Sequence, residues 1–366
     1  MSCDKCGPNR EKGYVFCPDC GSPLQEGCVY CAQYEREGYE FCGKCGRKLN
    51  PGPAAPADGT QSLKMAVLGL MPFVLILLGL EIVSMYAGAG STFSWLEGQT
   101  KNILMLLPML TTVGTLSGSA LQAVWIVLMI VVTACLAVFI YQSKAMLKPR
   151  SDGDTSEAEK TPLYWMCLLF GAMVVINLIA TVIGSVISGT PFGTPGWLED
   201  MQKEDVLFSM TNAAVWEEII ARVLPIGIPF AILALCHGRK DFGRYLLGGF
   251  GMNRLAFVLL VLSSIVFGAA HLEGWGAVKF LPAAIGGFVL GYMFIRFGIH
   301  TSIIMHFMFD MSTTLMFYGN LGMMVMGGII LIVMISGIVC LIILMGKIRN
   351  CTDDIRSMQV TGFEKK

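Results

Sequence analysis

The chain has 366 residues, of which 54% are hydrophobic and only 14% carry a charge. Soluble domains carry about 25% charged residues, so this composition excludes an ordinary soluble protein and indicates a polytopic membrane protein. The formal net charge is zero, so no excess of positive charge points to a nucleic-acid partner. The residues that follow Met1 contain no apolar stretch, and we therefore expect no cleaved signal peptide.

The cysteines are concentrated at the N-terminal end, where two Cys-x-x-Cys pairs separated by ten residues occur twice, with a period of 25. Each repeat supplies four thiolates, which is the number that closes a tetrahedral structural zinc site. The doubled spacing favours zinc over a redox or disulfide module. We expect a double zinc ribbon over residues 1–49 that holds two zinc ions, followed by a Pro/Gly/Ala linker over residues 50–62. The predicted ligands are Cys3, Cys6, Cys17, Cys20, Cys28, Cys31, Cys42 and Cys45.

The rest of the chain alternates polar connections with apolar runs of roughly 20 residues, the length that crosses a bilayer. The sequence therefore predicts an all-α polytopic membrane protein, with about eight transmembrane helices over residues 63–348 and a tail over 349–366. The expected spans are 64–87, 119–142, 163–187, 207–235, 255–272, 279–297, 300–317 and 322–346. Pro225 and Pro229 predict a kink or a division in the fourth span. Residues 92–116 are expected to form an interfacial or re-entrant segment.

Lysine and arginine are unequally divided between the two sets of connecting loops. One set carries Lys144, Lys148, Arg150, Lys160, Arg239, Lys240, Arg244, Arg254, Arg296, Lys347 and Arg349, whereas the other carries Lys101, Lys203 and Lys279. The positive-inside rule then places both termini in the cytoplasm of a cell-membrane protein. A cytoplasmic N-terminus agrees with reduced cysteines that can hold zinc.

The fourth expected span contains three charged side chains, Glu217, Glu218 and Arg222. Charges at bilayer depth cost from ~3 to more than ~10 kcal/mol each, so they mark a functional site by default. Glu218 and Arg222 are four residues apart, share a helix face and can pair. Glu217 lies about 100° round the helix and has no such neighbour. We therefore assign Glu217 to the chemistry, as a general base, and the pair to architecture or substrate handling.

Two further spans add polar side chains. His271 ends the apolar run Phe267-Gly-Ala-Ala-His, and His306 and Asp310 lie one turn apart on the seventh span. A single histidine near a helix end is usually interfacial, and a single Glu–Arg pair is often only a structural tie. Three spans that contribute such groups together are harder to explain without a site, because in one cavity they supply a base, a second proton carrier and hydrogen-bond donors. Glu81, deep in the first span, has no assigned role.

These motifs resemble those of the CAAX-prenyl-protease and bacteriocin-processing family of intramembrane endopeptidases. The family pattern of Glu-Glu-x-x-x-Arg, Phe-x-x-x-His and His-x-x-x-Asn/Asp corresponds to residues 217–222, 267–271 and 306–310, within a motif core of 205–317. The resemblance implies an eight-helix fold around a water-filled cavity and a glutamate-dependent hydrolysis of a membrane-associated protein or peptide. It also implies that Glu217 and His271 activate water, that His306 and Asp310 stabilise the oxyanion, and that Glu218 and Arg222 support them.

Several alternatives remain open at this point. Prenyl-protein proteases of the family carry Asn where this chain has Asp310, and an ionised aspartate cannot donate a hydrogen bond to an oxyanion. Asp310 is therefore either protonated or orients His306 or a water molecule. His271, His306, Glu217 and Asp310 could together bind a catalytic zinc ion, although the family is described as metal-independent. The main rival function is a non-catalytic membrane anchor or immunity-type protein, whose ribbons bind a cytosolic protein. A transporter is a third possibility, disfavoured because no inverted repeat is evident.

Overall fold

The computed structural model describes residues 59–106, 110–147, 156–189, 200–357 and 360–363, together with isolated positions before residue 50. The chain divides into two compact units, Met1–Ser62 and Leu63–Lys366. The expected ribbons and the linker therefore lie mostly outside the described residues. Cys17 and Cys42, which occupy equivalent positions in the two repeats, are both buried, with 1% of each residue exposed. Their equal burial is consistent with two like units.

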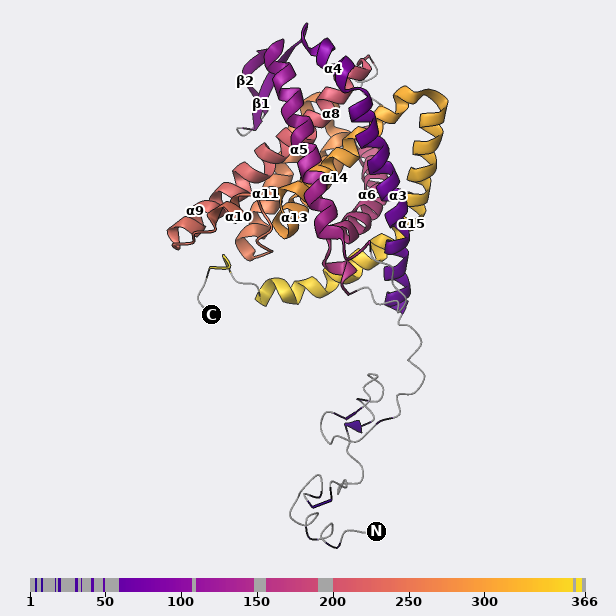
Figure 1. Ribbon diagram of the computed structural model, residues 1–366, viewed down its shortest axis with the longest axis vertical. Helices are drawn as coiled ribbons and strands as arrows, with labels where there is room; N and C mark the ends of the chain where they lie inside the picture. The colour runs from indigo at the N-terminus through magenta and orange to yellow at the C-terminus, as the bar shows by residue number, and fades with distance from the viewer. Residues whose placement is uncertain are drawn as a thin grey trace. The chain divides into compact units, whose positions relative to one another are not determined.

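Seven segments of the described residues are helical, long and apolar enough to cross a membrane. Four consist of one helix or part of one: α3 (Gly59–Ala87), α5 (Ser119–Ser143), α6 (Pro162–Ser188) and α15 (Gly319–Ser357). Three are composite: α8 (Lys203–Glu218) with η2 (Ile219–Gly227) and α9 (Ile228–Cys236), α11 (Arg254–Ala270) with α12 (Leu272–Trp275), and η3 (Ala277–Lys279) with α13 (Phe280–Phe297). Shorter elements between them are α4 (Ala89–Leu96), η1 (Ala158–Lys160) and α10 (Phe242–Leu246). The prediction of a helical, multi-pass membrane protein is confirmed (Figure 1).

The expected span 300–317 differs from the other spans. It consists of α14 (Ile299–Met311) and the 3-10 helix η4 (Ser312–Tyr318). Thirteen α-helical residues extend only about 20 Å, less than the ~30 Å of a bilayer core. Every residue from Thr301 to Met308 is buried, because α14 packs against α5, α8 and α13. A helix enclosed by other helices can carry His306 and Asp310 at membrane depth.

The fourth expected span divides at its prolines, as the sequence predicts. Directly after Glu218 the helix widens into the π-helix η2, which contains Pro225, and α9 begins with Pro229 in its first turn. A proline cannot donate its backbone nitrogen to the ladder, and a π-helix accommodates such an interruption without ending the helical path. The change from α-helix to π-helix therefore falls immediately after the two adjacent glutamates, Glu217 and Glu218.

Residues 92–116, expected to be interfacial or re-entrant, contain a β-hairpin that the sequence analysis does not predict. After α4 the chain forms an antiparallel hairpin of β1 (Thr100–Leu106) and β2 (Leu110–Ser117), with a register shift between Ile103 and Leu104. The segment is rich in Thr and in β-branched side chains, which favour strands, and that signal was missed. Trp216 donates its indole N–H to the Leu104 carbonyl at 2.6 Å, and Lys101 pairs with Asp205 at 2.6 Å. Both contacts hold the hairpin to α8.

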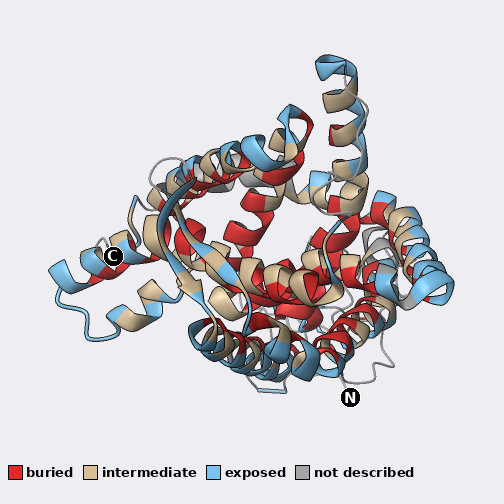
Figure 2. Ribbon diagram, turned by 90° about the horizontal axis from the view of Figure 1, so that it is seen from above, coloured by how far each residue is buried: buried red, intermediate tan, exposed pale blue. Residues whose placement is uncertain are grey.

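The distribution of buried and exposed residues fits a protein surrounded by lipid. In Figure 2 the buried residues lie mainly on the inward faces of the helices and the exposed residues on the outward faces. Large apolar side chains such as Val186, Ile187 and Leu321 are 73–80% exposed. Such exposure is unfavourable in water but costs little in a bilayer, where hydrocarbon replaces the missing protein neighbours.

Candidate active site

Glu218 and Arg222 form a fully buried ion pair. The Arg222 Nε lies 3.4 Å from the Glu218 Oε2, and neither side chain has any exposed surface. The Ser302 hydroxyl of α14 donates to the same Glu218 oxygen. The sequence predicts this pairing from the four-residue spacing, and the structure adds a third partner from a distant helix.

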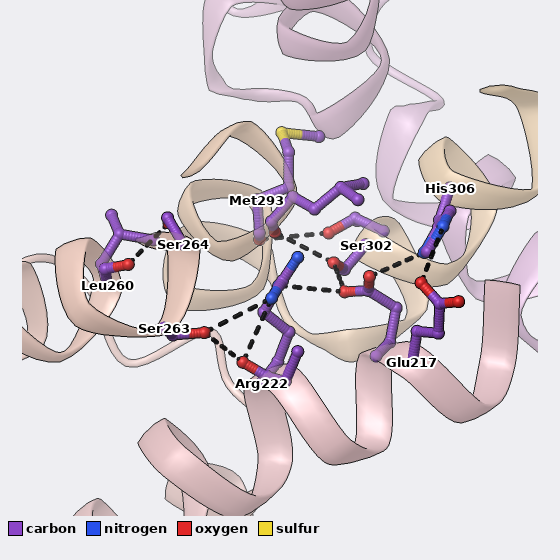
Figure 3. Close-up of polar contacts among 12 residues, drawn as sticks. Glu217, Arg222, Leu260, Ser263, Ser264, Met293, Ser302 and His306 are labelled. Carbon is purple, nitrogen blue, oxygen red and sulfur yellow. Dashed lines mark hydrogen bonds and ion pairs between the residues drawn. The ribbon is translucent and has the colours of Figure 1, made fainter. Parts of the chain in front are cut away.

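Arg222 is held on its other side by α11. Its Nη1 donates to the Ala221 carbonyl at 3.1 Å and to the Ser263 hydroxyl at 3.4 Å, and its guanidinium lies 4.8 Å from the centre of the Phe267 ring. Figure 3 shows Arg222 between Ser263 on one side and Ser302 on the other. Arg222 therefore links η2 to α11, and through Glu218 to α14.

His306 makes contacts with three carboxylates at once. Its Nδ1 lies 2.8 Å from the Glu218 Oε1, so the Nδ1 proton is donated to that buried carboxylate. On the other edge of the ring, Nε2 lies 3.4 Å from the Asp310 Oδ2 and 3.8 Å from the Glu217 Oε2. Figure 3 shows the His306 ring reaching toward Glu217. Glu218 thus fixes the ring so that Nε2 faces the two partly exposed carboxylates.

Glu217 and His271 line a common cavity of about 390 Å³. The His271 Nδ1 lies 2.8 Å from the Phe267 carbonyl, one turn earlier on α11, which assigns the proton to Nδ1 and leaves the Nε2 lone pair available. The wall is completed by residues of the hairpin, of η2 and of the segment around α12: Leu104, Thr112, Ile220, Ala221, Phe267, Ala270, Glu273, Gly274 and Trp275. The cavity is therefore a space beside a carboxylate and an imidazole, within the membrane unit.

Two of the six predicted site residues, Glu217 and His271, line this cavity. The other four are connected to Glu217 by side-chain contacts: His306 contacts Glu217, Glu218 and Asp310, and Glu218 pairs with Arg222. The expected span boundaries place Glu217, His271 and His306 at different membrane depths. The short helix α14 and the division at Glu218 remove the difficulty, because neither helix crosses the bilayer as a regular straight span. Sequence reasoning missed Ser302 and Ser263. Ser302 could have been found, since it lies four residues before His306 and shares its helix face.

The hairpin contact leads to a testable expectation. Trp216→Phe removes the donor to Leu104 while keeping most of the ring, and we expect about 1 kcal/mol less local stability in the hairpin. Hydrogen exchange of the amides of residues 100–106 should then be roughly five-fold faster. Trp165→Phe is the matched control, because Trp165 donates to the Glu159 carbonyl at 2.8 Å, away from the hairpin. Equal exchange in both variants would show that the indole bond does not hold the hairpin.

Among the described residues, no group of three or more His, Cys, Asp and Glu side chains is placed to hold a metal ion. The thiolates expected to bind zinc belong to the ribbons. For Cys17 and Cys42, burial at equivalent repeat positions fits closed tetrahedral sites, which exclude water. We expect two zinc ions per chain in elemental analysis of the purified protein. Cys17→Ser should lower this ratio to one without loss of membrane-unit helicity, whereas an ion that survives Cys17→Ser/Cys42→Ser would belong to the membrane unit.

Comparisons with known proteins give two family matches. Residues 204–312 match the family described as Type II CAAX prenyl endopeptidase Rce1-like. Residues 3–46 match the double zinc ribbon family, which implies zinc binding. No curated protein and no solved structure matches the chain. The chain therefore has an N-terminal segment that matches double zinc ribbons and a membrane segment that matches Rce1-like CAAX prenyl endopeptidases, and the second segment contains all six site residues.

Proposed function

We propose that the protein is an intramembrane endopeptidase that hydrolyses a peptide bond of a membrane-associated protein or peptide. The cavity beside Glu217 and His271 supplies space for a water molecule and a peptide carbonyl. The Rce1-like match supports the same reaction class. The ribbons, in this proposal, bind a cytosolic protein or recruit substrate.

In the proposed mechanism, Glu217 accepts a proton from water while the water oxygen attacks the carbonyl carbon. The His271 Nε2 accepts a second hydrogen bond from the same water and orients it. In this proposal His306 is an imidazolium with a proton on both ring nitrogens, beside the carboxylates of Glu217, Glu218 and Asp310, and the N–H of its Nε2 stabilises the resulting oxyanion. The carbon–nitrogen bond then breaks as the protonated Glu217 transfers its proton to the leaving amine.

The sequence leaves two roles open for Asp310: a protonated hydrogen-bond donor, or a group that orients His306 or a water molecule. In this proposal Asp310 orients His306. Its carboxylate lies 3.4 Å from His306 Nε2, as an acceptor beside a donor. Glu218 holds the opposite ring nitrogen at 2.8 Å. The imidazole is thereby fixed from both edges, and no hydrogen bond from an aspartic acid to the oxyanion is required.

One observation supports this division of roles more than any other. The two adjacent glutamates have opposite environments: the Glu218 side chain is 0% exposed, hydrogen-bonded to Ser302 and His306 and ion-paired with Arg222, whereas the Glu217 side chain is 31% exposed and lines the cavity. A carboxylate held on every side cannot take part in proton transfer to a substrate. Glu217 is free of such constraint and is the better general base.

Comparing the membrane proteomes of wild-type and Glu217→Gln cells tests the proposal. We expect a defined set of processed peptide ends to disappear in the variant. Glu97→Gln is the control, since it makes the same chemical change at an exposed position of the segment between α4 and β1. Unchanged processed ends in a folded, normally abundant Glu217→Gln protein would support the rival anchor or immunity function instead.

A further inference from the structure

The membrane unit has two faces that are defined by ion pairs. At one face, Glu159 pairs with Lys64 near the start of α3 at 2.8 Å and with Lys347 in α15 at 3.4 Å. We call this the start face, because α3 begins there. At the other, the hairpin face, α3 has ended and α4, β1 and β2 follow, with Lys101 bonded to Asp205 at the start of α8. Figure 1 shows α4 and the hairpin at one end of the bundle and the start of α3 at the other.

The rim of the cavity belongs to the hairpin face. Thr112 of β2 is exposed, and so are Glu273 and Gly274 of α12. Helix α11, which His271 follows directly, begins at the start face, because Leu255 donates its backbone N–H to the Val360 carbonyl, beyond the end of α15. It therefore ends at the hairpin face, where α12 follows.

The cavity is closed toward the start face. Glu218 and Arg222 are fully buried behind it, and the neighbouring Ala221 is only 1% exposed. Ser263 and Phe267 of α11 pack against Arg222 from the other side. This buried layer leaves access to the cavity from the exposed rim.

The charges of the described connecting segments distinguish the two faces. The start face carries Lys64, Lys144, Lys160, Arg239, Lys240, Arg244, Arg254, Arg296 and Lys347, whereas the hairpin face carries Lys101, Lys203 and Lys279. Of the latter three, Lys101 is paired with Asp205. The positive-inside rule assigns the lysine- and arginine-rich face to the cytoplasm.

We propose that the cavity opens on the extracytoplasmic side of the membrane. Given the proposed function, the substrate is then a membrane protein or exported peptide whose cleaved bond lies in the outer half of the bilayer or just beyond it. A lipidated C-terminus that approaches from the cytoplasm meets the opposite, closed face. The site thus selects its substrates first by the side of the membrane on which they are presented.

Cysteine labelling in intact cells with a membrane-impermeant maleimide tests this orientation. Glu273→Cys places a thiol at the exposed rim, and Asp241→Cys makes a matched change at an exposed position of the start face. Each variant is compared with the parent chain, which accounts for the native cysteines. We expect the first thiol to react equally before and after permeabilisation, and the second to react only afterwards. Any other pattern overturns the proposal.

The orientation can be separated from the catalytic proposal. Labelling is measured again in the Glu217→Gln background, where the accessibility of both thiols should be unchanged. If no processed ends depend on Glu217, the proposed function fails while the labelling result stands. If processed ends do depend on Glu217 but map to cytoplasmic segments of their proteins, the function stands and the orientation is overturned.

Discussion

Replacing Glu217 by glutamine is expected to lower the rate of peptide-bond cleavage about 100- to 10,000-fold, the usual contribution of a general base. The amide keeps the shape of the side chain but cannot accept the proton of water. The fold should persist, because Glu217 is 31% exposed and its contact with His306 is 3.8 Å long. Cleavage of a peptide taken from the missing processed ends, measured with purified protein in detergent or vesicles, checks the rate.

Two comparisons make this result specific. The thermal unfolding midpoint of Glu217→Gln should match that of the wild type, whereas Glu218→Gln should unfold at a lower temperature, since Glu218 bonds Arg222, Ser302 and His306. A full cleavage rate in Glu217→Gln would remove Glu217 from the mechanism. If Glu217→Gln lost both cleavage activity and thermal stability, the role of Glu217 would be structural.

Replacing Arg222 by methionine is expected to destabilise the membrane unit by about 3–5 kcal/mol. The substitution leaves Glu218 buried with no cationic partner on its own helix. Methionine has a similar length and retains the packing against Phe267, so the loss reports the charge and not a cavity. The free energy of unfolding can be measured by denaturant titration in mixed micelles.

The controls for Arg222 use both a second variant and a second ion pair. Glu218→Gln/Arg222→Met removes both charges, and we expect it to recover a substantial part of the stability lost in the single variant. Arg239→Met breaks the exposed pair with Asp241, at 3.0 Å, and should leave the unfolding midpoint unchanged. If Arg222→Met behaves like Arg239→Met, the buried pair is not a major tie between helices.

The sequence predicts the elements of the site better than their arrangement. The spacing of Glu218 and Arg222 predicts their ion pair, because both residues lie within one turn of a helix. The contact of His306 with Glu218 joins residues 88 positions apart, and no local pattern specifies it. The same holds for the contact of Ser302 with Glu218, which joins residues 84 positions apart. Long-range partners follow from helix packing, which the sequence encodes only collectively.

The hairpin and α14 are difficult to predict from the sequence for a related reason. Hydropathy recognises a helix that faces lipid, but α14 is surrounded by protein and needs no continuous apolar surface. The strand residues from Thr100 to Ser117 lie between two strong membrane helices, and their alternation is interrupted by Gly114 and the register shift at Ile103. Both elements line or support the cavity, so the least regular parts of the sequence pattern coincide with the site.

The π-helix η2 makes the site depend on the number of residues in the chain as well as on their identity. In an α-helix each residue turns the direction of the side chains by about 100°. If all nine residues of η2 took α-helical bonding, α9 would be rotated relative to Glu217 and Glu218, because a π-helix has more residues per turn than an α-helix. Phe230, which is fully buried and stacks on Phe250 at 4.4 Å, would lose its pocket. A substitution that converts η2 to α-helical bonding would therefore displace α9 unless one residue were also removed.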